Sequence, residues 1–200
     1  MKKNLSVSTN NKLISSAIEY VRELFAGNSD GHGFDHAMRV YRNAVTIADG
    51  EECDATVVAL AALLHDADDP KIFDTRDNAN ARTFLDDAGV GPETSERVIR
   101  AINSVSFSKN RGKTPETAEG RIVQDADRLD AIGAVGIART FAYGGAHGRS
   151  LDESVKHFHE KLLLLKDMMN TETGRRLAAV RHSFLETFLR ELEEETGEKR

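Results

Sequence analysis

The stretch VVALAALLHDADD, residues 57–69, joins a purely apolar run to a group of metal-ligand side chains. The run from Val57 to Leu64 has the length of a buried helix, because a membrane span needs about 18 apolar residues or more. His65 and Asp66 follow it directly. Buried charge is unfavourable unless it is paired or bound to a metal ion. The stretch therefore predicts a core helix that presents polar ligands at one end.

The apolar spacing elsewhere is also helical. Apolar residues recur at intervals of three and four over 13–24 and over 34–49, which is the period of an amphipathic helix. Asp54 is a good N-cap for the apolar run. Further helices are expected over 77–88 and, opened by Pro92, over 92–104. With no strand pattern and no repeat, the sequence predicts an all-α, single-domain helical bundle over residues 1–200.

The second half of the chain carries its own expectations. Residues 117–141 look helical, with tight packing or a break near Gly133 and Gly136. The glycine-rich segment 143–148 predicts a flexible loop, and helices are expected over 151–170 and 174–195. We place the metal-binding core at about residues 30–135 and the C-terminal helices at 150–195.

The charge balance limits the partners. Lys and Arg number 27 and Asp and Glu 33, so the net charge is −6. A chain that coats a nucleic-acid polymer carries a basic surface, so a polymeric nucleic-acid partner is not expected. A small anion remains compatible if a cation binds between it and the protein. Hydrophobic residues make up 40% of the chain, enough for a core.

Cys53 is the single cysteine, so no intramolecular disulfide forms and a reducing compartment suits the chain. The basic residues at the N-terminus are not followed by the apolar core of a signal peptide. We expect a cytoplasmic protein without a membrane partner, as a monomer or a homodimer.

Three separated clusters carry imidazole and carboxylate groups: residues 35–36, 65–69 and 125–130. Imidazole with several carboxylates and no thiolate suits Mn or Mg first, and Fe, Co, Ni or Zn less specifically. His65 and Asp66 alone could simply end a helix, but three clusters beside apolar helices favour a divalent metal site. From spacing alone Asp125, Asp127 or Asp130 could each supply the last ligand.

In chain order, His36, His65-Asp66 and Asp127 match the H…HD…D signature, so the chain resembles the HD-domain metal-dependent phosphohydrolases. It is most similar to a bacterial subgroup of small HD hydrolases, above all in the run IVQDADRLDAIGAVGIAR at 122–139. The resemblance extends over about residues 20–190. It implies that the metal ligands are His36, His65, Asp66 and Asp127, with Asp130 in a supporting role.

Two further carboxylates are candidate catalytic residues. Asp69 lies four residues after His65 and shares its helix face, so we expect it to orient or deprotonate the attacking water. Related HD nucleotidases have an acid at this offset and another nine residues after the histidine, which is Asp74 here. The resemblance implies that Asp74 contacts the substrate sugar or a second metal ion. A solvated turn is the alternative for both.

Cationic side chains should meet the substrate phosphates. Arg39 lies three residues after His36, on the same helix face. Lys109 and Lys113 belong to the polar segment 107–117, which could fold over a di- or triphosphate. For any one of these lysines, a solvated loop is the simpler interpretation.

These observations predict a divalent-metal-dependent phosphohydrolase that acts on a small phosphorylated substrate, a nucleotide, by attack of metal-activated water on phosphorus. One alternative is an HD-type phosphodiesterase or a guanosine-tetraphosphate-type hydrolase. A non-catalytic sensor that binds metal and nucleotide is another.

Overall fold

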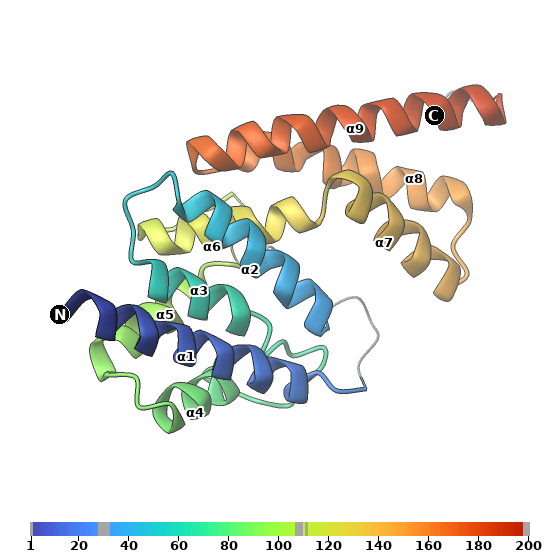
Figure 1. Cartoon of the computed structure of the whole chain (residues 1–200). Coiled ribbons are helices and arrows are strands. Elements are labelled where there is room, and N and C mark those ends of the chain that lie inside the picture. The colour runs from blue at the N-terminus through green and yellow to red at the C-terminus, as the bar shows by residue number, and fades with distance from the viewer. Residues whose placement is uncertain (1, 28–32, 107–109, 111, 198–200) are drawn as a thin grey trace. The chain divides into compact units, whose positions relative to one another are not determined.

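The computed structural model describes residues 2–27, 33–106, 110 and 112–197, and over these residues it contains helices and no strand. This confirms the predicted all-α class (Figure 1). In chain order the elements are α1 (Lys2–Leu24), α2 (Phe34–Ala48), α3 (Ala55–Leu64), α4 (Ala79–Asp87), α5 (Pro92–Asn103), α6 (Ala118–Asp130), α7 (Gly133–Ala146), α8 (Leu151–Glu160), the 3₁₀ helix η1 (Leu162–Met168) and α9 (Glu172–Thr196). Within the described segments no helix is long and apolar enough to cross a membrane.

The chain divides into two compact units, Met1–Ala126 and Asp127–Arg200, and the division falls inside α6. The single domain over 1–200 stays a prediction, as do its core at 30–135 and its C-terminal helices at 150–195.

The first unit is built around α3, which packs against α1, α2 and α5. Every residue from Val57 to Leu64 is buried, with at most 5% of its surface exposed. Asp54 caps this helix, since its Oδ1 accepts hydrogen bonds from the amides of Thr56 at 3.0 Å and Val57 at 3.3 Å. The core helix and its N-cap are therefore both confirmed.

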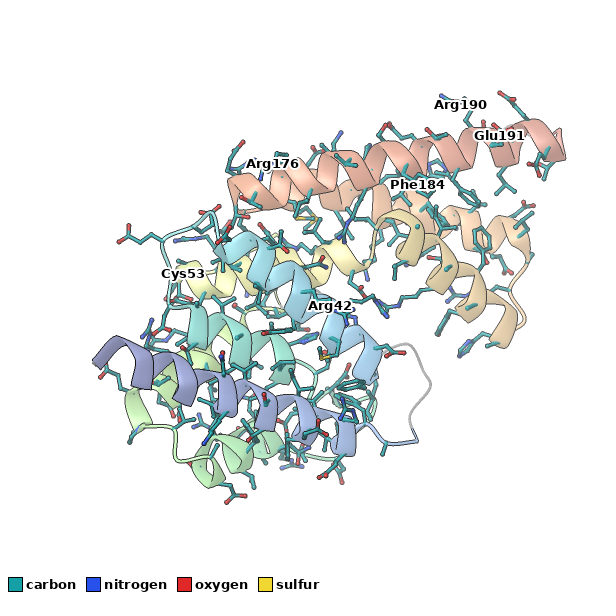
Figure 2. The ribbon with its side chains drawn as sticks, viewed as in Figure 1. Arg42, Cys53, Arg176, Phe184, Arg190 and Glu191 are labelled. Atoms are coloured by element: carbon teal, nitrogen blue, oxygen red, sulfur yellow. The ribbon has the colours of Figure 1, made fainter. Side chains whose placement is uncertain are left out.

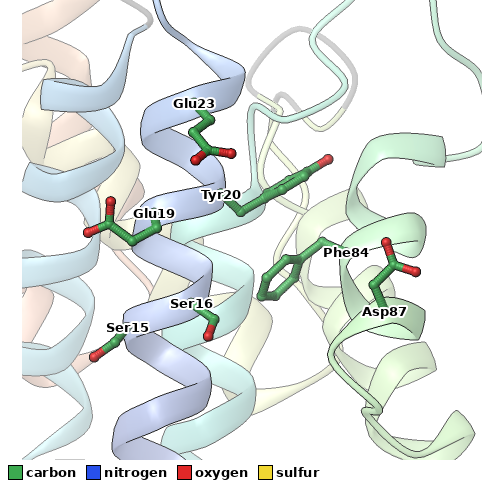
Figure 3. Close-up of a pocket in the computed structure, with 7 residues that line it drawn as sticks. All are labelled: Ser15, Ser16, Glu19, Tyr20, Glu23, Phe84 and Asp87. Carbon is green, nitrogen blue, oxygen red and sulfur yellow. The ribbon is translucent and has the colours of Figure 1, made fainter.

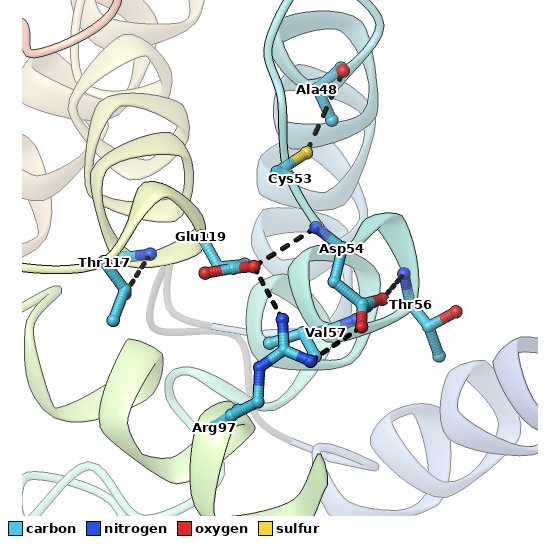
Figure 4. Close-up of polar contacts among 9 residues, drawn as sticks. Ala48, Cys53, Asp54, Thr56, Val57, Arg97, Thr117 and Glu119 are labelled. Carbon is cyan, nitrogen blue, oxygen red and sulfur yellow. Dashed lines mark hydrogen bonds and ion pairs between the residues drawn. The ribbon is translucent and has the colours of Figure 1, made fainter.

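An ion network surrounds this N-terminal end of α3 (Figure 4). Arg97 of α5 donates to Asp54 Oδ2 and to Glu119 Oε1 of α6, each at 2.9 Å. Glu119 Oε1 also accepts from the Asp54 amide at 3.1 Å. Burial raises the pKa of Glu119, but the hydrogen bonds from its own amide and that of Asp54, together with Arg97, outweigh burial and lower it overall. The network joins three helices, and its two carboxylates share the one guanidinium of Arg97.

Hydrogen bonds join the beginning of the segment after α3 to its end. The carboxylate of Asp68 accepts from the amides of Asn80 at 2.9 Å and Ala81 at 3.1 Å, so it caps the start of α4. Just before this helix, Asp77 and Asn78 both have φ of 57°, in the left-handed region. The two left-handed residues explain why α4 starts at Ala79 rather than at residue 77 as expected, because they cannot continue a right-handed helix.

The structure of the second unit differs from two of the predicted elements, the first of them at the end of α7. The break expected near Gly133 is found between α6 and α7, where Gly133 has φ of +77°. However, α7 continues to Ala146, so the prediction of a flexible loop over 143–148 is wrong for most of that segment. A Cβ on Gly144 would lie 2.5 Å from Ser154 Oγ of α8. The glycine therefore permits close packing rather than flexibility.

The single helix expected over 151–170 is also wrong. Helix α8 ends at Glu160, and residues 162–168 form the 3₁₀ helix η1. Side chains three residues apart eclipse one another in a 3₁₀ helix, so Leu162 and Leu165 are buried on one side while Leu164 is 48% exposed. Helix α9 then matches the helix expected over 174–195.

Candidate metal centre

Two histidines and a carboxylate converge at the C-terminal end of α3. His36 comes from the first turn of α2 and is 3% exposed, and His65 is the C-cap residue of α3. Their Nε2 atoms are 3.1 Å apart. Asp66 Oδ2 lies 3.4 Å from each of these nitrogens. Three of the four predicted metal ligands thus meet in one place in the first unit.

The backbone fixes the orientation of the His65 ring. Its Nδ1 lies 2.9 Å from the carbonyl oxygen of Ala62, one turn earlier in α3. A carbonyl oxygen only accepts hydrogen bonds, so Nδ1 is the donor, and in the neutral ring Nε2 then keeps its lone pair. That lone pair belongs to the nitrogen closest to His36 and Asp66. A ring held in this tautomer by a backbone carbonyl is the usual arrangement of a metal-binding histidine.

The spacing of these atoms fits a divalent cation. Two nitrogens about 2.1 Å from one ion, at a right angle, are about 3.0 Å apart. The observed separation of 3.1 Å between His36 Nε2 and His65 Nε2 agrees with this value. In addition, Asp66 follows the C-terminus of α3, where the helix dipole disfavours an anion and favours a cation. Donor types, distances and helix field all suit a metal ion.

Asp127 lies on α6, directly after Ala126. The side-chain amide of Asn43 donates to the Ala126 carbonyl at 3.1 Å and so attaches this part of α6 to α2. Asp127 itself is the first residue of the second unit, and its role as the last metal ligand stays a prediction. Among the other candidates for the last ligand, Asp130 is buried and pairs with Arg139 at 2.6 Å. The supporting role of Asp130 at the metal site stays a prediction.

The predicted catalytic carboxylates lie in and after the turn that follows the cluster. The amide of Asp69 donates to the carbonyl of Asp66 at 3.1 Å, so the two residues belong to one turn. One Asp69 oxygen, Oδ1, accepts from the amide of Lys71 at 3.0 Å. Asp69 is half-buried, whereas Asp74 is exposed in the segment before α4.

The cationic residues predicted to bind phosphate lie in separate parts of the chain. Arg39 is half-buried on α2, one turn after His36. Lys113 is exposed in the segment that leads to α6, and Lys109 lies outside the described residues. Asp68, which the sequence groups with the acidic ligands, is instead the cap of α4. No local signal marks that role, because its partner Asn80 is twelve residues away.

A separate groove lies between α1 and α4 and has a volume of about 440 Å³ (Figure 3). The rings of Tyr20 and Phe84 lie in it, 5.0 Å apart. Burial, and then the charges of Asp68 and Asp87, raise the pKa of the Tyr20 hydroxyl. Because three carboxylates line this groove, it repels phosphate and is not the expected substrate site. Its lining residues are Ser15, Ser16, Glu19, Tyr20, Glu23, Phe84 and Asp87.

Known proteins share both the sequence and the fold. The family model of the HD domain matches residues 33–132. The chain is 46% identical over 185 residues to the uncharacterized protein YpgQ of Bacillus subtilis, covering 88% of this chain and 90% of that protein. The crystal structure of YpgQ in complex with ADP has a TM-score of 0.80 and 39% identity, over 94% of this chain and 96% of that one. An HD-superfamily hydrolase from Bacillus thuringiensis has a TM-score of 0.81 and 36% identity, over 95% and 100%.

Proposed function

Because the chain belongs to the HD domain family, we propose that it is a divalent-metal-dependent phosphohydrolase whose substrate is a nucleotide. The family and the related HD-superfamily hydrolase make the chain a metal-dependent hydrolase. The nucleotide is the finer step, and the ADP bound to YpgQ supports it.

The observation that carries the proposal is the convergence of His36, His65 and Asp66 on one point. Their nearest ligand atoms are 3.1 to 3.4 Å apart. When His65 is protonated at Nδ1 and His36 is unprotonated at Nε2, these three atoms are hydrogen-bond acceptors and none of them can donate to another. Such a set is stable when a cation lies between its members. We assign these three residues and Asp127 as the ligands, and Mn²⁺ or Mg²⁺ as the first choice of ion.

A divalent ion bound there neutralises phosphate charge and lowers the pKa of water, which supplies a nucleophile near neutral pH. The protein's own groups set the geometry. Asp69, in the same turn as Asp66, orients the attacking water and accepts its proton through the oxygen not bonded to Lys71. Asp74, exposed on the same segment, contacts the sugar or a second ion.

Phosphate charge beyond the ion needs cationic partners. Arg39, one turn after His36 on α2, meets part of this charge, and so do Lys109 and Lys113 of the sequence segment 107–117. The net charge of −6 favours a small nucleotide over a polymer. We also propose a cytoplasmic location, since the single cysteine suits a reducing compartment.

A hydrolysis screen tests the function. The chain is stripped of metal and assayed on nucleoside mono-, di- and triphosphates with added Mn²⁺, Mg²⁺, Co²⁺ or Ni²⁺, and the products are separated by chromatography. We expect hydrolysis that requires the ion and is reduced about 10³-fold or more in Asp66→Asn, because a ligand charge is lost. The nucleotide that is cleaved, and the products, identify the bond.

Asp68→Asn is the matched control, because it alters a carboxylate two residues away that caps α4. It should lower stability but retain most of the activity of the folded protein. Asp69→Asn should bind metal normally and lose activity. Full activity of Asp66→Asn, or metal-independent turnover, would contradict the proposed site, and binding of nucleotide without turnover would identify a sensor.

A further inference from the structure

The groove between α1 and α4 combines aromatic rings with negative charge (Figure 3). Its lining contains the rings of Tyr20 and Phe84 and the carboxylates of Glu19, Glu23 and Asp87. Among the described residues that line it, none is a lysine, an arginine or a histidine. The lining that repels phosphate therefore attracts a cation.

The two rings form an apolar surface that contacts on both helices hold in place. Their centroids are 5.0 Å apart and their planes are tilted by 33°. Phe84 is buried, and the Tyr20 hydroxyl donates to the carbonyl of Asn80 at 2.9 Å. Burial, and then the charges of Asp68 and Asp87, raise the pKa of that hydroxyl, so negative potential reaches the ring. The face of such a ring attracts a cation within about 6 Å of its centroid.

The three carboxylates differ in how their charge is used. Glu19 pairs with Arg22, three residues later on α1. In the described part of the chain, no basic side chain forms an ion pair with Glu23 or Asp87. Figure 3 shows the two rings between Glu23, which comes from α1, and Asp87, which comes from α4. Two uncompensated charges thus lie on opposite walls of an aromatic groove.

This lining distinguishes between kinds of cation. Mg²⁺ and Ca²⁺ bind through about six or more oxygen ligands, and aromatic rings supply none. An aliphatic polyamine matches both parts of the lining. Its methylene groups contact the rings, and each ammonium group has three donors for carboxylates and for the hydroxyls of Ser15 and Ser16. The groove volume of about 440 Å³ lies within the usual range for small-molecule sites.

We propose that the groove between α1 and α4 binds an aliphatic polyamine. One ammonium group pairs with Glu23, another pairs with Asp87, and the chain between them lies against Tyr20 and Phe84. The lining contains none of the residues assigned as metal ligands. The site therefore does not depend on the proposed hydrolase activity.

Calorimetric titration of the full chain with spermidine, in the absence of nucleotide, tests the site. We expect saturable binding of one molecule per chain. Glu23→Gln/Asp87→Asn should raise the dissociation constant about tenfold or more, because both ammonium groups lose a charged partner. The matched control is Asp86→Asn/Glu191→Gln, which removes the same charge from two exposed residues outside the groove and should leave the constant unchanged. Glu191 of α9 is labelled in Figure 2.

Two outcomes of this titration overturn the proposal. One is the absence of saturable binding. The other is an equal loss of affinity in the two double variants, which would mean that spermidine responds only to the net charge of an acidic chain.

The chemistry of the ligand is tested by competition. An alkyl diol of the same length, or Mg²⁺ at the concentration of spermidine, should not displace spermidine. Tyr20→Leu keeps apolar contact but removes the ring face, and should raise the dissociation constant about threefold to fivefold. Displacement by the diol would identify a merely apolar groove, and displacement by Mg²⁺ a merely acidic one. Either result contradicts a polyamine site.

Asp66→Asn separates this site from the proposed metal centre. The variant should bind spermidine with the wild-type dissociation constant, whether or not the chain hydrolyses nucleotides. Loss of spermidine binding in Asp66→Asn would place the polyamine at the metal centre and overturn the proposal.

Discussion

The two ends of α3 handle charge in opposite ways. At the N-terminal end, Asp54 meets the amides of its own helix and the guanidinium of Arg97, and Glu119 joins the same network (Figure 4). At the C-terminal end, the side chains that meet are the imidazoles of His36 and His65 and the carboxylate of Asp66. One end contains anions and a cation, whereas the other gathers groups that bind a cation.

The helix field sharpens this contrast. A carboxylate at a helix N-terminus is favourable, and Asp54 is in that position. Asp66 follows the C-terminus, where the same field opposes an anion. The first arrangement stabilises the fold without any external partner, whereas the proposed function has a bound ion stabilise the second. Stability and metal binding should therefore be separable by substitutions at the two ends of one helix.

The largest expected effect is that of the ion itself. Adding Mn²⁺ at about 100 times its dissociation constant should stabilise the metal-free chain by about 2.7 kcal/mol, which raises the melting temperature by about 5–10 °C. Differential scanning calorimetry measures the shift. It should vanish in Asp66→Asn and persist in Asp54→Ala. A shift in melting temperature that persists in Asp66→Asn would contradict the proposal that the ion binds at the C-terminal end of α3.

Asp54→Ala should cost about 2 kcal/mol of unfolding free energy, because α3 loses its cap and Arg97 loses one of two carboxylates. Chemical denaturation measures this cost, with the exposed Glu52→Ala as the control. The affinity for Mn²⁺, measured by calorimetric titration, should stay at the wild-type value. Loss of metal affinity here would show that the two ends are coupled.

Glu119→Gln should have the smallest effect, about 1 kcal/mol near neutral pH. Because the folded-state pKa of Glu119 is lowered, its carboxylate contributes stability above the ordinary glutamate pKa, and this contribution is lost as the pH falls through the lowered value. Unfolding curves of both proteins should therefore converge in acid. A difference that stays constant with pH would mean that the carboxylate charge is not what stabilises the network.

The helices of the first unit were predictable because burial follows a simple period there. The run from Val57 to Leu64 and the cap at Asp54 are features of local sequence, and both are found as expected. The three clusters of imidazole and carboxylate groups favoured a metal site, and the family resemblance then named its ligands. His36 lies 29 residues before His65, and spacing alone does not say which helix ends lie together.

The predictions of secondary structure that were wrong concern segments whose conformation depends on tertiary packing. Gly144 suggested a loop, but its missing side chain makes room for Ser154, and α7 continues past it. The leucines at 162–165 fit an α-helix as well as a 3₁₀ helix. The two differ in their backbone hydrogen bonds, which the side-chain pattern does not specify. Likewise, the cap that Asp68 gives to α4 depends on a turn of twelve residues. In each case the deciding contact is absent from any short window of sequence.

The hydrogen bonds from the amides of Asn80 and Ala81 to Asp68 hold the two ends of the intervening segment together. The segment between them, which includes Asp69 and Asp74, is closed at its base by bonds that do not involve its middle. Doubling the length of a closed loop costs only about 0.6 kcal/mol of entropy. Insertions between residues 74 and 76, after the Phe73 ring that packs against Phe25, should therefore leave the helices in place, so this short stretch is a natural position for grafting new substrate preferences onto an unchanged scaffold.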